Sequence, residues 1–392
     1  MAAQADSSHT QSLLRTPGLL TAMAMGGAAF GGWALLLPVV PLVVSAAGGS
    51  DALAGSVTGI FMAATVVTQL MVPSMLRRWG HRVVLALGCV LLGPPSLVLL
   101  LSTDAVPVLA VSAVRGSGFG MLTVAGSALV AELVPRSALG RATGAQGIAI
   151  SAAQVIGLPA GLAVYQRLSE VPVFVLGALV PMVAVAAISR LPNIRPHPRT
   201  GEAGRLPITM ILVPWLAIAV VAAAFGGLSS LLPIAISDRA ALAGGVLAVV
   251  SAATLVGRYT AGTAADRLGP GRVLVPAMAS AVFGLACFSV AVAIHAPSWL
   301  LVVGAVGFGF GFGAVQNESL VMIFTASGPA RFGAASAGWN IGFDAGTGIG
   351  ALTLGITAAV AGYVWVFGVA AVVVTAVAAT ATVVGARVDR AG

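Results

Sequence analysis

Twelve long apolar segments constrain the fold of this chain more than any other feature of its sequence. A helix of roughly 20 apolar residues crosses the hydrocarbon core of a bilayer, and it satisfies its own backbone groups where lipid cannot. The segments do not alternate in polarity, as the strands of a membrane β-barrel would. The sequence therefore predicts an all-α membrane protein with twelve transmembrane helices. We expect these helices at residues 18–44, 52–76, 83–102, 107–133, 142–166, 172–190, 208–236, 241–265, 273–294, 299–325, 333–358 and 364–386.

Composition indicates that lipid, rather than water, surrounds most of the chain. Only 8% of the residues are charged, whereas soluble domains carry about a quarter, and the mean hydropathy is +1.05. The two cysteines, Cys89 and Cys287, each lie in an apolar segment and suggest no disulfide framework or metal site. No phosphate-binding loop or hydrolase motif is present. We therefore expect a protein that is not an enzyme and that needs no metal or cofactor.

The arginines predict how the helices are oriented. One set of connections holds only Arg167 and Arg239, while the other set and both tails hold most of the remaining arginines. Positive residues accumulate in cytoplasmic loops, so we expect a multi-pass protein of the cytoplasmic membrane with both termini in the cytoplasm. The basic connector before residue 208 is then a cytoplasmic linker, and we expect no nucleic-acid partner.

The same apolar phrases occur twice in the chain, about half its length apart. "AAFGGWALLLP" from Ala28 resembles "AAFGGLSSLLP" from Ala223, and "ALAG" begins both the second segment at Ala52 and the eighth at Ala241. This duplication predicts two pseudo-symmetric six-helix bundles, at residues 1–190 and 208–392, joined by a linker at 191–207. Parallel repeats of this kind form transporters whose site lies between the halves.

These repeats resemble the major facilitator superfamily, and three motifs support the resemblance. The phrase "GTAADRLGPGR" matches the family's G-x-x-x-D-R-x-G-x-x-R signature with Gly262, Asp266, Arg267, Gly269 and Arg272. The corresponding first-half connection keeps Arg78, Gly80 and Arg82, but has Pro73 and Arg77 where the family has Gly and Asp. The phrase "GLPAG" is similar to a fifth-helix element of antiporters, with Gly157, Pro159 and Gly161 and an extra Leu158. The resemblance implies alternating access, gating roles for both loops, and antiport.

Five ionisable residues fall inside the predicted helices: Arg115, Glu132, Arg258, Glu318 and Asp344. Each charge costs about 2.5–3.5 kcal/mol at a helix centre, so each needs a partner or a wet cavity. We expect Glu132 to clamp the nearby arginine-rich loop and Arg258 to pair with the signature loop. Arg115 resembles the family's embedded arginine, and either binds an anionic substrate or is capped by backbone carbonyls.

Polar residues beside two of these carboxylates suggest a substrate pocket. Glu318 lies in the inner half of the tenth helix and Asp344 near the midplane of the eleventh. Their polar and aromatic neighbours are Gln316, Asn317, Trp339 and Asn340. Hydrogen bonding between helices explains Gln316 and Asn317 equally well. We expect Asp344, with Glu318, to carry a coupling proton, because removal from water favours the uncharged form of a carboxyl group. All four histidines lie in tails or connections in this interpretation, which excludes a histidine relay.

Glycines and prolines predict where helices approach closely or bend. Gly342, Gly346 and Gly350 share one helix face, and Gly307 to Gly313 form a similar run. Small faces allow helices to pack closely and to slide. Pro38, Pro41 and Pro233 are expected to kink the first and seventh helices.

Three functions are compatible with the sequence. The first is proton-coupled efflux of a small amphipathic organic compound by a chain that works as a monomer in the lipid bilayer. The second is proton-coupled import or facilitated passage of a small organic anion, with Arg115 as its counter-ion. The third is a membrane sensor or scaffold without transport, which the short tails make the weakest of the three.

Overall fold

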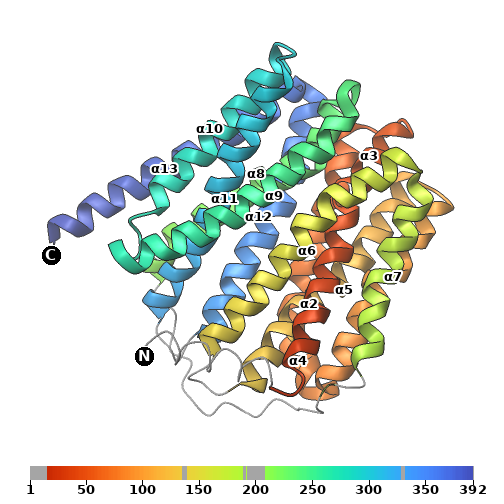
Figure 1. The fold of residues 1–392 in the computed structure, drawn as a ribbon, viewed down its shortest axis with the longest axis horizontal. Coiled ribbons are helices and arrows are strands. Elements are labelled where there is room, and N and C mark those ends of the chain that lie inside the picture. Colours follow the sequence, from red (N-terminus) through yellow and green to blue (C-terminus); the bar gives the residue numbers. More distant parts are fainter. Residues whose placement is uncertain (1–15, 135–138, 189–190, 192–207, 328–331, 392) are drawn as a thin grey trace, which may run out of the picture.

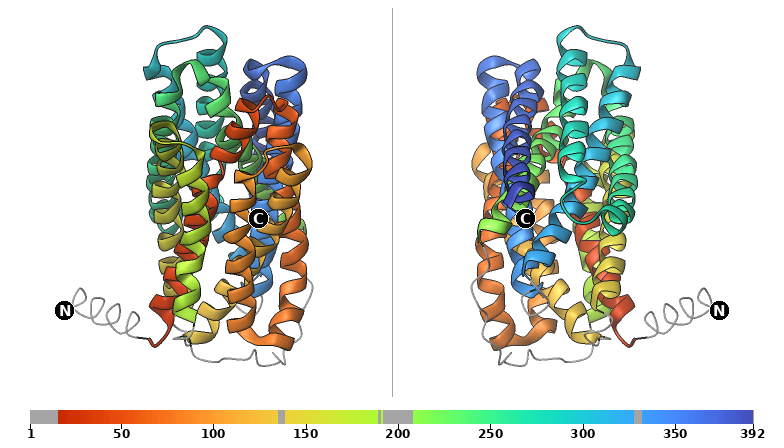
Figure 2. Two further views of the ribbon diagram at one scale, coloured as in Figure 1. Left: turned by 90° about the vertical axis from the view of Figure 1, so that its right-hand side faces the viewer. Right: turned by 90° about the vertical axis from the view of Figure 1, so that its left-hand side faces the viewer.

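The computed structural model describes residues 16–134, 139–188, 191, 208–327 and 332–391 (Figure 1). Every regular element among these residues is a helix. The side views show the long helices running in roughly the same direction (Figure 2). Many apolar side chains point outward, including Leu70 and Val183, which are 69% and 72% exposed. Such a surface is stable against lipid and not against water.

The first half of the chain contains six α-helices and one 3₁₀ helix in the described residues. They are α2 (Leu19–Leu36), α3 (Val39–Ala46), α4 (Asp51–Leu92), η1 (Pro94–Leu100), α5 (Ala105–Leu133), α6 (Leu139–Arg167) and α7 (Glu170–Ile188). The second half contains the remaining helices of the described residues. They are α8 (Ile208–Ala235), the short η3 (Ser237–Arg239), α9 (Ala240–Leu268), α10 (Leu274–Ala293), α11 (Ser298–Ser327), α12 (Phe332–Ala361) and α13 (Tyr363–Ala391).

Helix α4 contains two of the predicted membrane spans. The described residues hold 11 segments long and apolar enough to cross a membrane, and one of them, Asp51–Leu100, is 50 residues long. At 1.5 Å per residue, 50 helical residues reach about 75 Å, more than twice the roughly 30 Å core of a bilayer. The chain leaves helical geometry at Gly80, where φ is 78° and ψ is 169°. The predicted fold class is thus confirmed, with the second and third spans inside one continuous element.

Gly80 has a counterpart in the second half of the chain. Gly269 follows α9 with φ 87° and ψ 157°, close to the angles of Gly80. Positive φ strains residues with a Cβ, so glycine is the residue type suited to both turns. The two signature connections therefore share a backbone conformation as well as a sequence pattern, which is what duplication of a six-helix unit predicts.

Prolines change the helices near the start of each half in different ways. The first predicted span is broken at Leu37 and Pro38, which separate α2 from α3. Pro41 lies inside α3 and Pro233 inside α8, and neither ends its helix. The predicted span 83–102 is α-helical only to Leu92. The prolines that follow Gly93 lack the N–H that an α-helix needs, and the chain continues as η1.

Helices of the same half pack mainly on one another. The largest contacts in the first half join α4 to α5 and α2 to α6, and those in the second join α9 to α11 and α8 to α12. Contacts between the halves are formed chiefly by α4 with α12 and by α6 with α9. In Figure 1 the red-to-yellow helices and the green-to-blue helices occupy different sides of the molecule. The bundle boundaries at 190 and 208 stay a prediction, because residues 192–207 lie outside the described part.

The predicted glycine faces pack helices of the same half against each other. A Cβ on Gly346 or Gly350 of α12 would overlap the main chain of α8 at Ala219 or Ala223. Gly342 faces the ring of Trp215, which also lies on α8. In α11 the glycines divide between two neighbours. Gly307 and Gly311 face α10, whereas Gly309 and Gly313 face α9. Close packing inside a bundle is therefore the structural role of these two runs.

Candidate functional site

Asp344 lies at the contact between the two halves of the molecule. The side-chain amide of Gln69, on α4, donates a hydrogen bond of 2.6 Å from Nε2 to Oδ2 of Asp344, on α12. The same amide also lies 3.1 Å from the Thr123 hydroxyl of α5. Gln69 and Asp344 are each 4% exposed. A buried carboxylate thus links one half of the chain to the other through a single amide.

Small residues surround this link and bring α4 and α12 close together. A Cβ on Gly59 would meet Leu352 at 3.1 Å, and Gly348 packs on Met62. Thr58 and Ser230, on α4 and α8, join their hydroxyls at 2.9 Å. Farther along, Tyr363 donates a hydrogen bond to Asp51. We call these contacts the α4–α12 seam. They are made by the part of α4 from Asp51 to Gln69, mainly with α12 and also with Ser230 of α8 and Tyr363 of α13.

Glu318 has a different partner from the one that we expected. Its carboxylate accepts a hydrogen bond from the main-chain N–H of Gly271 in the turn between α9 and α10, and the Val273 amide also interacts with it. Glu318 is fully buried. The structure therefore places it at the signature turn, where it holds α11 to the start of α10. Among the described residues, no hydrogen bond joins it to Asp344.

The four polar and aromatic neighbours of these carboxylates divide into two groups. Trp339 donates from Nε1 to the Ser319 hydroxyl at 2.9 Å, which ties α12 to α11, and Asn340 donates to the Ser336 carbonyl of its own helix. Gln316 Nε2 and Asn317 Nδ2 are buried without a hydrogen-bond partner in the described residues. Unpaired buried amides are costly. They are thus the two groups here with donors left for a bound molecule.

Arg115 is held inside the first half of the chain. Its Nε donates to the Leu92 carbonyl at 3.0 Å, and its guanidinium lies 5.7 Å from the centre of the Phe61 ring. The side chain is 4% exposed, and its Nη2 has no hydrogen-bond partner in the described residues. Of the two roles expected for it, the carbonyl cap is the one that these contacts match.

Arg258 reaches the other half of the chain. Its Nη1 donates to the Ser151 hydroxyl of α6 at 2.9 Å, and Nη2 faces Gly147 of the same helix. The expected pairing with the signature loop at Asp266 stays a prediction, because the Asp266 side chain lies outside the described residues. Arg258 and Asp344 are therefore the two embedded charges that bridge the halves.

Glu132 faces the arginine-rich connection, as expected, and does so through a histidine. Its Oε2 lies 3.8 Å from Nδ1 of His81, which is 1% exposed. His81 follows Gly80 at the turn between the two helical parts of α4, so it lies in a connection as expected, and it is buried there. Arg82 donates to the Leu191 carbonyl at 2.9 Å, so this turn also holds the end of the first half.

The remaining signature residues lie at the ends of their helices. Arg78, Arg267 and Arg272 are exposed, while Gly262 faces the Asn317 side chain. In the fifth-helix element, a Cβ on Gly157 would meet Ala34 at 2.8 Å, and Gly161 packs on Leu35. The main chain at Pro159 lies beside Gly244 of α9. The element thus packs α6 on α2 and reaches the other half at its proline.

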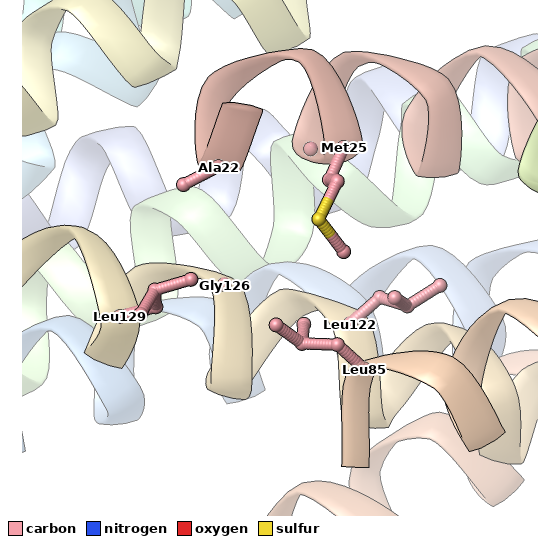
Figure 3. A pocket seen from close by; sticks show the side chains of 7 residues that line it. Ala22, Met25, Leu85, Leu122, Gly126 and Leu129 are labelled. Carbon is pink, nitrogen blue, oxygen red and sulfur yellow. The ribbon is translucent and has the colours of Figure 1, made fainter. Parts of the chain in front are cut away.

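Two hollows lie among the described helices. The first, between α2, α4 and α5, is lined only by apolar side chains and glycines, with Met25 pointing toward Leu85 and Leu122 (Figure 3). The second lies between the halves. It is lined by Ser151, Gln154, Val155 and Leu158 of α6, Phe225 of α8, Ser251, Thr254 and Leu255 of α9, and Phe312 of α11. Of these two hollows, only the second combines polar groups with aromatic rings, and in this structure it has room for about one water molecule.

Sequence reasoning missed several of these residues. Gln69, Thr123 and Ser151 are uncharged polar residues inside apolar helices. From residue type alone, a side chain that bonds to a distant helix cannot be told apart from one that bonds to its own backbone. A signal for Gln69 was available, because a glutamine amide is too large to be satisfied by its own helix as serine and threonine hydroxyls are. Ser151 carried no such signal, since its role depends on Arg258 of a distant helix.

Comparison with known proteins agrees with this architecture. The sequence matches the Major Facilitator Superfamily over residues 22–323 and again over residues 214–390, whereas no curated protein matches it. A crystal structure of a mutant of the nucleoside transporter NupG has a TM-score of 0.73 at 13% identity, covering 93% of this chain and 99% of that one. A bacterial homologue of the human lysosomal transporter Spinster, inward-facing and unoccupied, has a TM-score of 0.71 at 15% identity, covering 93% and 95%.

The structural likenesses establish a shared fold, and the sequence match covers most of the chain. Both agree with the paired six-helix pattern of this chain. The chain therefore belongs to the Major Facilitator Superfamily, a family of membrane transporters.

Proposed function

We propose that this protein is a proton-coupled transporter that works by alternating access and exports a small amphipathic organic compound. The observation that carries the proposal is the hydrogen bond between Gln69 and Asp344, which joins α4 to α12 at 2.6 Å. Alternating access requires that contacts between two bundles are made and broken in turn. A buried carboxylate in such a contact gives the coupling proton a place to act.

The strength of this link depends on the charge of Asp344. An amide N–H binds an ionised carboxylate about twice as strongly as a neutral acceptor. Protonation of Asp344 therefore weakens its bond with Gln69, and it also removes the cost of an uncompensated buried charge while the bundles separate. Loss of the proton restores the link. Binding of a proton to Asp344 therefore favours opening of the α4–α12 seam, and opening of the seam favours proton binding.

The rest of the seam supports movement of this kind. Its contacts include glycines packed on the side chains of Leu352 and Met62, and the hydroxyl pair of Thr58 with Ser230. Such contacts are weak individually, and the other carboxylate of the seam, Asp51, accepts a hydrogen bond from Tyr363 at its end. Because Glu318 holds the signature turn through Gly271, we assign the coupling proton to Asp344 and a positioning role to Glu318.

Asp344→Asn tests the coupling, because the amide has the shape of the carboxyl group and carries no titratable proton. The purified protein is reconstituted into liposomes with an imposed pH gradient and a pH-sensitive dye inside. With compounds that the parent transports, Asp344→Asn is expected to lose substrate-dependent proton flux at least tenfold while retaining exchange of substrate for substrate. Glu318→Gln is expected to keep the coupling at a lower rate. Full proton coupling in Asp344→Asn contradicts the assignment.

Direction, orientation and assembly are part of the proposal. Export is supported by the resemblance of the fifth-helix element, with Gly157, Pro159 and Gly161, to that of antiporters. The arginine distribution supports a cytoplasmic membrane location with both termini in the cytoplasm. Reaction of a cysteine placed in the 192–207 connector with an impermeant maleimide, in cells before and after lysis, checks this orientation. Both halves of the path lie in one chain, so a monomer suffices.

A second function, passage of a small organic anion, is favoured by one observation. Among the described residues, no carboxylate lies within ion-pair distance of Arg258. An embedded cation that has no carboxylate beside it in the described residues, which do not include the Asp266 side chain, suits an anionic substrate. Arg115, the counter-ion expected from the sequence, instead binds the Leu92 carbonyl.

A further inference from the structure

We propose that the hollow between α6 and α9 is a binding subsite for an organic carboxylate with a flat apolar body, and that Arg258 binds its carboxylate. This inference rests on the proposed transport function and specifies the substrate for it. It joins the two functions above: an amphipathic compound and an anion are one substrate class when a single molecule has a ring at one end and a carboxylate at the other.

Arg258 supplies the charged end of this subsite. It lies one helical turn beyond Thr254 on α9, so the two residues share a face of the helix, and Thr254 lines the hollow. One guanidinium nitrogen, Nη1, binds Ser151, another residue of the lining. A guanidinium presents parallel N–H groups that match the two oxygens of a carboxylate. Ser151 thus orients Arg258 at the rim of the hollow.

The other polar groups of the lining indicate which sign of charge a bound molecule should carry. Ser251 and Thr254 donate their hydroxyl protons to carbonyls of their own helix, Leu247 and Val250. The Ser151 hydroxyl and the Gln154 amide belong to the lining, and the guanidinium of Arg258 is joined to it through Ser151. Among the described residues, no aspartate or glutamate is part of the lining. A set of donors beside a cation favours an oxyanion over a cation or a neutral amine.

Aromatic rings supply the apolar end. Phe225 and Phe312 both line the hollow and stack on each other, with ring centres 4.6 Å apart and planes 16° apart. Phe312 also stacks with Phe308. Stacked rings at the wall favour a flat substrate. The walls belong to different halves, α6 on one side and α8, α9 and α11 on the other, so movement of the bundles changes the width of the subsite.

The test compares 2-naphthoate with 2-naphthamide, which has the same ring and no charge. Calorimetric titration of the detergent-purified full chain is expected to show naphthoate binding at least tenfold more tightly, about 1.4 kcal/mol. Arg258→Gln is expected to reduce this preference to within about twofold, Arg258→Lys to keep part of it, and Ser151→Ala to lower naphthoate affinity several-fold. Arg167→Gln, which removes an exposed arginine at the far end of α6, is the matched control and leaves the preference unchanged.

Two results overturn the subsite. One is a wild-type protein that binds the two compounds equally or binds neither, and the other is an unchanged preference in a folded Arg258→Gln. If Arg258→Gln does not elute as a folded monomer, the Arg258→Lys and Ser151→Ala titrations decide the question. Failure of the proposed function gives a different pattern. Proton flux is then absent for every compound, while the Arg258-dependent preference for naphthoate remains.

Discussion

At the scale of single residues, the identity of the partner decides what an embedded polar group does. Asp344 binds an amide across the two halves, Glu318 binds a main-chain N–H in its own half, and Arg115 binds a carbonyl next to an aromatic ring. All three are buried. Only the first partner belongs to the opposite half, and this is why the proposed coupling proton is assigned to Asp344.

Gly346 shows how a residue without a side chain positions a helix. A Cβ there would overlap the Ala219 carbonyl of α8, so Gly346→Ala is expected to lower the free energy of unfolding by about 1–3 kcal/mol through overpacking. Gly245→Ala is the matched control, because no atom lies within 4 Å of the added Cβ. It is expected to be neutral or stabilising. Thermal unfolding in detergent measures both, and equal melting temperatures for the two variants would disprove the packing role.

At the scale of elements, the two signature turns are the points where the chain reverses between helices of the same half. Gly80 and Gly269 share positive φ, and each turn is held by a neighbouring element. Arg82 reaches the Leu191 carbonyl after α7, and Glu318 of α11 reaches Gly271. The family signature thus specifies a turn geometry and its attachment in both copies.

Alanine substitutions test this reading of the turns. Gly80→Ala and Gly269→Ala each force a residue with a Cβ into the left-handed region, at a cost of about 1–2 kcal/mol. Both variants are expected to melt at lower temperature than the parent. Gly126→Ala, in a helix where the nearest atom would be 3.8 Å from the new Cβ, serves as the control. A Gly80→Ala or Gly269→Ala protein as stable as this control would show that the conformation is not required.

At the scale of the whole molecule, transport depends on separation of the two halves. Asp344 joins the halves in the α4–α12 seam, and Arg258 joins them in the α6–α9 contact. Elsewhere the seam is formed by glycines, apolar side chains and hydroxyls, with Asp51 bonded to Tyr363 at one end. Few charged groups therefore lose a partner when the seam opens.

A disulfide across the seam tests whether the halves must separate. The hydroxyls of Thr58 and Ser230 are 2.9 Å apart, so cysteines at both positions bring their sulfurs close enough to form a bond after small adjustments. With the buried Cys89 and Cys287 replaced by serine, oxidation of the double variant is expected to abolish transport, and a reductant to restore it. Each single cysteine variant is the control. Transport that continues at the parent rate in the cross-linked protein contradicts alternating access.

The residues that sequence reasoning identified are those whose type is unusual for their surroundings. A carboxylate or an arginine in an apolar helix is costly, so Asp344, Glu318 and Arg258 were recognisable as candidates. Their partners were not. Gln69, Ser151 and the Gly271 amide lie 275, 107 and 47 residues away from them in the chain, and no spacing rule for a single helix connects such positions.

The sequence by itself determined the solvent, the helices and their number, and the doubling of a six-helix unit, because these follow from local hydropathy and from repetition along one dimension. Only the tertiary structure decided that Glu318 serves a turn and that Asp344 and Arg258 face the opposite half. The physical reason is that a helix exposes side chains in every direction. Which direction meets lipid, which meets its own bundle and which meets the other half is settled by packing among distant helices.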